Sequence, residues 1–146
     1  MNVTLSHRLI VPADANHHGT LYAGSLLRIS LEAAYATAWR HIGTQANVVL
    51  RRVLNIECLR AVPVGTVVEL QGVVMHLTRA YIVIGLIGTP LSQEDGPWLE
   101  ALMGFAQVDN EGRPAELPDE IELPPLPDGE AWARLKTRLQ KLLRIR

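Results

Sequence analysis

Residues 14–41 read DANHHGTLYAGSLLRISLEAAYATAWRH, and this stretch decides the fold. A polar, glycine-containing loop leads directly into a segment with helical periodicity that is apolar almost all the way round. Only Arg28, Ser30 and Glu32 interrupt it before Arg40. A helix that is apolar on every side has to be covered by protein, and a carboxylate in such surroundings is costly unless it is paired or used. We therefore expect chemistry at the loop and at the start of the helix.

The elements around this helix follow from short local signals. Ser25 is the expected N-cap and Gly43 the expected stop. Residues 4–11 have the pattern of a first strand, and residues 47–108 that of four more strands joined by short turns. Strands joined by short turns pair antiparallel. In the strand from residue 48 to residue 58, the even-numbered side chains are the more apolar and should face the helix. The order predicts an α+β fold in which an antiparallel sheet curves around one long central helix.

The far face of the sheet also needs a cover. Residues 81–87 are apolar on both faces of their strand, and one helix covers only one face of a sheet. We therefore expect a second protein surface on the back, and hence a homo-oligomer. The segment from residue 130 predicts an amphipathic C-terminal helix, with Trp132 and Leu135 on its apolar side and Arg134, Arg138 and Lys141 opposite. The expected organisation is one domain over residues 1–112, with a proline-rich extension and a helix packed on it over residues 113–146.

Composition excludes several classes of function. The chain has 146 residues, is 48% apolar and 20% charged, and has a net charge of -1, which gives no bias toward nucleic acid or membrane. We expect neither partner, no secretory signal, and a cytoplasmic protein, because the single cysteine, Cys58, fits a reducing compartment. We expect the Cys58 side chain to pack on the side of the sheet that faces the helix. The adjacent His17 and His18 diverge and give no metal-ligand spacing, so no metal is expected.

Two catalytic loop motifs fail on inspection. Residues 19–25 have the glycine spacing of a phosphate loop. Leu26 follows Ser25, however, and the motif has no lysine to reach the phosphates of a nucleotide. A nucleophile elbow around Ser25 needs glycine two residues before and two residues after the serine. This chain has Ala23 and Leu27 there, so the motif is absent.

Three motifs in order carry a resemblance to a known family. Asn16, Gly19-Thr20-Leu21-Tyr22 and Gly24, followed by the apolar helix, resemble the hot-dog fold acyl-CoA thioesterases. The segment VPVGTVVE at residues 62–69 is similar to that family's turn between long strands, and VDNEGRP at residues 108–114 resembles its last strand and exit. The resemblance covers roughly residues 5–115.

The resemblance implies a site for thioester hydrolysis at an interface between two copies. Gly24, at the helix N-terminus, would polarise the thioester carbonyl through its N–H group, and Asn16 would orient water or the thioester. Gly19 and Ser25 would contact the substrate. Glu32 is the expected general base, with Asp14 and His18 in reserve. No cofactor is implied.

The chain also departs from the family pattern. Many members have an acid seven residues after the second glycine of the loop, where this chain has Leu31, and the first of the paired glycines is Ala23. Glu32 is one residue further on, about 100° round the helix. It either serves as the base, pairs with Arg28 at i, i+4, or contacts a partner subunit.

Three arginines are candidates for the phosphates of coenzyme A. Arg51 and Arg52 are adjacent in an otherwise apolar strand, so one should point to each face of the sheet. These two and Arg79 either bind the phosphates or pair with carboxylates such as Glu57 and Glu69. The expected function is hydrolysis of an acyl-CoA by a homodimer or a dimer of dimers. The alternatives are a non-hydrolytic protein that binds acyl-CoA or acyl carrier protein, a hydratase or dehydratase of the same fold, or a purely structural interaction protein.

Overall fold

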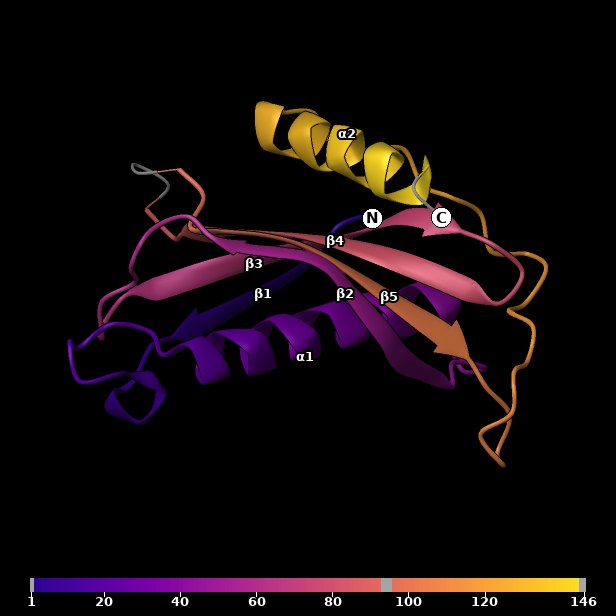
Figure 1. Ribbon diagram of the computed structural model, residues 1–146, viewed down its shortest axis with the longest axis horizontal. Helices are drawn as coiled ribbons and strands as arrows, with labels where there is room; N and C mark the ends of the chain where they lie inside the picture. Colours follow the sequence, from indigo (N-terminus) through magenta and orange to yellow (C-terminus); the bar gives the residue numbers. More distant parts are fainter. Residues whose placement is uncertain (1, 93–95, 145–146) are drawn as a thin grey trace.

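The computed structural model describes residues 2–92 and 96–144, which form one sheet with a helix on each face (Figure 1). The helices are α1 (Ala23–Ile42) and α2 (Glu130–Arg144), and a short 3-10 turn, η1 (Pro12–Asp14), precedes α1. The strands are β1 (Thr4–Leu9), β2 (Val48–Cys58), β3 (Val67–Leu77), β4 (Tyr81–Pro90) and β5 (Leu99–Gln107). Their spatial order is β1-β3-β4-β5-β2, and every neighbouring pair is antiparallel. The expected long helix followed by antiparallel strands is confirmed.

Small side chains let α1 lie close to the sheet face that we call the front face. Ala34 and Ala38 of α1 are fully buried on the side of the helix that faces the sheet. Gly72 of β3 is directly below Thr37, and a Cβ atom on Gly72 would overlap the Thr37 hydroxyl. The hydroxyl itself donates to the carbonyl of Ala33 at 2.8 Å. The contact between α1 and β3 therefore depends on the absence of a side chain at Gly72.

One side of α1 is uncovered, contrary to what its composition predicts. Leu27, Tyr35 and Trp39 are each 42–46% exposed, and Leu50 and Val53 of the edge strand β2 are 40–41% exposed. We call these five side chains the apolar flank. Soluble monomers rarely leave large apolar patches in contact with water unless something binds there. The apolar side of the helix is therefore only partly buried within a single chain.

The back face of the sheet is covered by α2, as Figure 1 shows. Trp132, Leu135 and Leu139 of α2 are buried. Their partners in the same apolar cluster are Val73, Val83, Ile87 and Leu102. The expectation that another protein covers this face is wrong, because the chain's own C-terminal helix does so. The burial of residues 81–87 therefore gives no evidence for an oligomer.

An ion-pair cluster ties α2 to the sheet. Glu100 of β5 is buried, and its carboxylate accepts hydrogen bonds from Arg134 at 2.6 Å and from Arg138 at 3.3 Å. The hydrogen bond and charge of Glu100 raise the pKa of Arg134. The two arginines thus reach toward the sheet, and they still share one surface groove with Lys141, as the sequence pattern predicted. Their pairing removes the cost of a lone buried carboxylate.

The alternation expected along β2 is interrupted by two bulges. The pairing of β2 with β5 shifts register between positions 50 and 52 and again between positions 53 and 55. As a result, Leu54 joins the apolar cluster under α2 instead of facing α1. Cys58 is exposed, not packed, and its thiol donates to the carbonyl of Arg60 at 3.2 Å. In the described chain, β2 pairs only with β5, so its outer edge is free.

Candidate active site at the start of the long helix

The loop before α1 is shaped by Asn16. Its side-chain Oδ1 accepts the backbone N–H groups of His18 at 2.9 Å and Thr20 at 3.2 Å, while its Nδ2 donates to the Thr20 hydroxyl at 3.1 Å. The backbone N–H of Asn16 also donates to the carbonyl of Thr20 at 2.8 Å. Gly19 completes the turn with a φ of 75°, a left-handed conformation that favours glycine. The loop is therefore closed on itself around one amide.

Asp14 anchors the beginning of this loop. The residue is only 2% exposed, and its carboxylate accepts the backbone N–H of Val11 at 3.1 Å. It also accepts hydrogen bonds from Arg8 at 3.2 Å and from Arg28 of α1 at 3.4 Å. The Val11 hydrogen bond, followed by the two arginines, lowers the pKa of Asp14 against the opposing effect of burial. A carboxylate with all these partners is a structural anchor and a poor base.

The first turn of α1 presents three backbone donors. The helix begins at Ala23 with Tyr22 as its N-cap and without a side-chain cap, so the expectation of Ser25 as N-cap is wrong. The first N–H bonded within the helix is that of Leu26, which donates to the carbonyl of Tyr22 at 2.9 Å. Helix geometry leaves the N–H groups of Ala23, Gly24 and Ser25 without an intrahelical acceptor. They lie at the positive end of the helix dipole.

Gly24 has a packing role at this end of the helix. A Cβ atom on Gly24 would stand 2.5 Å from Cε2 of the Tyr22 ring. The absence of a side chain lets the ring fold back over the first turn. Gly24 itself is exposed.

Glu32 lies two turns further along α1 on the exposed outer side of the helix, seven residues before Trp39 of the apolar flank and about 20° from it round the helix axis. The Glu32 side chain is 60% exposed, and its nearest cation is Arg28 at 3.8 Å. It lines a shallow groove with residues of β1, among them His7 and Arg8. Leu31, at the position of the usual acid, packs half-buried against the front-face core. The Glu32 carboxylate therefore lies in exposed surroundings, whereas Leu31, where the family pattern has an acid, lies against the core.

The two loop histidines are exposed and contact each other. The ring centroids of His17 and His18 are 3.9 Å apart, with the planes tilted by 42°. Within residues 2–92 and 96–144, no group of three or more His, Cys, Asp or Glu side chains is placed to hold a metal ion. In the same part of the chain, no helix is long and apolar enough to cross a membrane.

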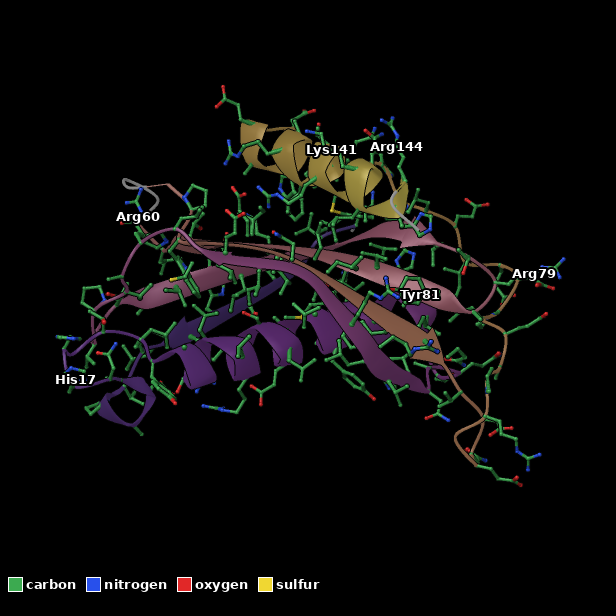
Figure 2. All side chains as sticks on the ribbon, viewed as in Figure 1. His17, Arg60, Arg79, Tyr81, Lys141 and Arg144 are labelled. Carbon is green, nitrogen blue, oxygen red and sulfur yellow. The ribbon has the colours of Figure 1, made fainter. Side chains whose placement is uncertain are left out.

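Five of the sequence candidates lie together, whereas Glu32, Arg51 and Arg79 lie elsewhere in the chain. Asn16, His18, Gly19, Gly24 and Ser25 lie together at the loop and the start of α1. Figure 2 shows His17 of this loop at one end of the molecule and Arg79 at the other. The Arg79 side chain is 90% exposed and lies 4.0 Å from Glu116.

Arg51 also lies away from the loop, on the bulged part of β2, where it lines a pocket. The neighbouring Arg52 and the Tyr81 ring line the same pocket, and sequence reasoning did not group the three. The only sequence signal was the pair of adjacent arginines, because the bulge that brings both to one pocket leaves no mark in the apolar pattern.

Comparisons with known proteins agree with this architecture. The thioesterase superfamily model matches residues 18–89. An acyl-CoA hydrolase from Staphylococcus aureus, solved in complex with butyryl coenzyme A, coenzyme A and coenzyme A disulfide, is similar with a TM-score of 0.79 at 19% identity, over 99% of this chain and 83% of that one. An apo-hexameric acyl-CoA thioesterase has a TM-score of 0.76 at 25% identity, over 99% and 92% of the two chains.

A hexameric thioesterase from Yersinia pestis has a TM-score of 0.71 at 26% identity, over 78% of this chain and 93% of that one. No curated protein matches the chain in sequence. The matched segment begins within the loop, two residues after Asn16, and contains all of α1, β2 and β3 and nearly all of β4. The structural likeness extends over nearly the whole chain. The chain therefore has the hot-dog fold and the architecture of the acyl-CoA thioesterases, and its residues 18–89 match the thioesterase superfamily.

Proposed function

We propose that the protein hydrolyses an acyl-CoA thioester to a free acid and coenzyme A. The observation that carries the proposal is the exposed first turn of α1, where the N–H groups of Gly24 and Ser25 stand beside a loop organised by Asn16. The similar structures described as acyl-CoA hydrolases and thioesterases supply the substrate class.

The proposed reaction is attack of water on the thioester carbonyl. Negative charge develops on the carbonyl oxygen, and backbone donors aimed at it are each worth about 10²–10³ in rate. The tetrahedral intermediate then collapses with cleavage of the C–S bond, and the coenzyme A thiolate takes up a proton. A carboxylate that accepts the proton of the attacking water is the remaining requirement.

Glu32 is the proposed base, and its position implies that it acts on a substrate held by another copy. It follows Gly24 by eight residues, which is about 12 Å along a helix axis. That separation is too long for both groups of one chain to act on a single thioester. Asp14 is not proposed for this role because its carboxylate is buried and fully paired.

We propose that the second copy pairs along β2. The outer edge of β2 is free, and the apolar flank adjoins it. The loop packs beside the segment that follows β2, since Leu21 donates to the carbonyl of Val62 at 2.8 Å. In an antiparallel pair of β2 strands, the start of one strand lies beside the end of the other. Arg51 of one chain would then approach the Asn16 loop of its partner.

The proposed minimal unit is therefore a homodimer. Two of the similar structures are described as hexamers, a number of chains that pairs can make up, whereas the sequence predicted a homodimer or a dimer of dimers. Light scattering coupled to gel filtration would measure the assembly of this chain directly.

An acyl-CoA panel tests the proposal. Purified protein is mixed with acyl-CoAs of increasing chain length and a thiol-reactive dye, which reports the free coenzyme A. We expect turnover by wild type and a loss of at least about tenfold in Glu32→Gln, because general-base catalysis is commonly worth that or more. Lys136→Gln, on the outer side of α2, is the matched control for a surface substitution. Turnover of no acyl-CoA by wild type would overturn the proposal.

A second candidate is a protein that binds acyl-CoA or an acyl carrier protein without hydrolysis. The observation in its favour is Leu31, which packs against the core where related enzymes place an acid. In that case, an acyl-CoA would raise the melting temperature of the protein in the absence of turnover. A hydratase or dehydratase has less support, because His18 is exposed against His17.

A further inference from the structure

A pocket of about 360 Å³ lies on the back face of the sheet, where the starts of β2 and β4 meet the end of β5. Its floor is a row of side chains from three neighbouring strands, since Val49 and Tyr81 both pair in register with Ala106. Its outer wall is Gly112 and Pro114, in the segment that turns back after β5. Pockets that bind small organic ligands start at about this volume.

The floor of the pocket is flat and apolar. The Tyr81 ring reaches across β5 over Gly104, and a Cβ atom at Gly104 would overlap the phenol oxygen. The ring therefore lies along the sheet, and the small Ala106 beside it leaves the surface open. A flat apolar floor with an aromatic ring suits a planar heterocycle, which gains from stacking on such a surface.

Two arginines stand at the rim of this pocket. Arg51 and Arg52 are neighbours in sequence, and regular alternation would send them to opposite faces. The bulge at this point of β2 brings both to the same pocket. Among the described residues, neither guanidinium has a recorded hydrogen bond or ion pair, whereas Arg134 and Arg138 on the same face are paired with Glu100. Two unpaired guanidinium groups side by side fit a doubly charged phosphate group better than a single carboxylate.

We propose that this pocket binds a phosphorylated nucleoside, with the base on the Val49–Ala106–Tyr81 floor and a phosphate held by Arg51 and Arg52. The same chemistry is offered by the nucleotide end of coenzyme A and by a free nucleotide. The first source rests on the proposed function, because antiparallel pairing of β2 would carry this pocket toward the loop of the second copy. The second source does not depend on it.

Calorimetric titration of the full-length protein tests the proposal, with adenosine 3′,5′-bisphosphate as the probe. Adenosine alone and inorganic phosphate alone are the comparison ligands. We expect the bisphosphate to bind, and each comparison ligand to bind at least about tenfold more weakly, because each forms only part of the contacts. In the double variant Arg51→Gln/Arg52→Gln, the affinity for the bisphosphate should fall at least about tenfold through loss of two charge-assisted contacts.

The control removes an equal kind of charge elsewhere. Lys136→Gln on the outer side of α2 should leave the affinity for the bisphosphate unchanged. Both arginines are exposed, and a thermal melt of the double variant checks that it is folded. Failure of wild type to bind the bisphosphate, or equal binding by wild type and the double variant, would overturn the proposal.

Competition with an acyl-CoA identifies the source of the nucleotide. If the bisphosphate displaces the acyl-CoA and the double variant raises KM with kcat unchanged, the pocket holds the nucleotide end of coenzyme A. If the bisphosphate binds through the arginines without competing, the pocket takes a free nucleotide. Arginine-dependent binding in a protein that neither binds nor hydrolyses acyl-CoA would leave this inference standing and remove the proposed function. Turnover of an acyl-CoA by wild type, together with equal binding of the bisphosphate by wild type and the double variant, would overturn this inference and leave the proposed function standing.

Discussion

Asn16 stands out in the sequence because of its place in the loop motif, and the structure gives it a second role. Its Oδ1 accepts two backbone N–H groups and its Nδ2 donates to Thr20, so the amide first holds the loop in shape. Sequence reasoning expected it to orient the substrate. Asn16 can both hold the loop in shape and orient the substrate in one of two ways. Either the ligand contacts the loop that Asn16 organises, or the ligand replaces one of the hydrogen bonds of the Asn16 amide.

Replacement of Asn16 separates the two roles. In Asn16→Ala, the N–H groups of His18 and Thr20 lose their acceptor, and we expect kcat/KM for the best acyl-CoA to fall at least about tenfold, with a stability loss of about 1 kcal/mol. Asn16→Asp keeps the acceptor and loses the donor. If shaping the loop is the whole role, Asn16→Asp will have nearly wild-type kcat/KM. A loss as large as in Asn16→Ala would show that Nδ2 has a role of its own.

Asp14 makes stability depend on pH in a defined direction. Its pKa is lowered in the folded chain below the ordinary value of 3.8, so the folded state favours the charged form. This contribution is fully present above pH 3.8 and is lost as the pH falls through the folded-state pKa. Asp14→Asn should cost about 2 kcal/mol at pH 7 through loss of charge-assisted hydrogen bonds. Denaturant melts at several pH values check the change.

The variant should also depend less steeply on pH in acid than wild type does. Some dependence will remain, because the hydrogen bonds from Gln71 and His7 also lower the pKa of Glu69 below its ordinary 4.5. Parallel stability curves for the two proteins between pH 2 and pH 5 would contradict the assignment.

At the scale of elements, local signals predicted ends and turns better than strand faces. Gly43 ends α1 and Gly112 closes the turn after β5, both with the positive φ that favours glycine. The N-cap of α1 was missed by three residues because Tyr22, and not Ser25, occupies that position, without a side-chain hydrogen bond. The faces of β2 were missed because a bulge depends on pairing with β5, which a local pattern does not contain.

The contact between α1 and β3 gives a test at this scale. Gly72→Ala places a methyl group into the Thr37 hydroxyl, and we expect a loss of about 1–3 kcal/mol from overpacking. Adding Thr37→Ala removes the obstruction and should recover part of that loss. Urea denaturation of wild type, the two single variants and the double variant measures the coupling. Additive losses would show that the two residues do not meet as described.

At the scale of the whole molecule, the prediction of a homo-oligomer was argued from a face of the sheet that the chain covers by itself. The apolar strand at residues 81–87 suggested a missing partner, but α2 fills that place with its own Trp132 and Leu135. The sequence predicted α2 as an amphipathic helix, but it did not predict which face of the sheet the helix covers. A long proline-containing segment separates α2 from the strands, so no local pattern relates the two. The apolar surface that the described chain leaves uncovered is the flank beside β2, and it became apparent only once α1 was placed.

A charge on the free edge of β2 should separate the copies. Val53 is 41% exposed, and Val53→Lys places an ammonium group in the proposed interface. We expect a folded monomer without thioesterase activity, measured by light scattering and the coenzyme A assay. Leu5→Lys on the other edge strand, where Leu5 is 49% exposed, is the control and should stay dimeric and active. Dissociation by Leu5→Lys alone would place the interface at β1.

Mixing two inactive variants tests the central claim, a thioester site that takes its donor loop from one chain and Glu32 from the other. Asn16→Ala and Glu32→Gln are unfolded together, refolded as an equal mixture, and assayed beside each variant alone. Half of the dimers are then mixed, and each mixed dimer has one intact site. The mixture should therefore recover about a quarter of wild-type activity for a two-fold symmetric dimer. Activity no higher than the average of the separate variants, with mixed dimers shown to be present, would contradict the account.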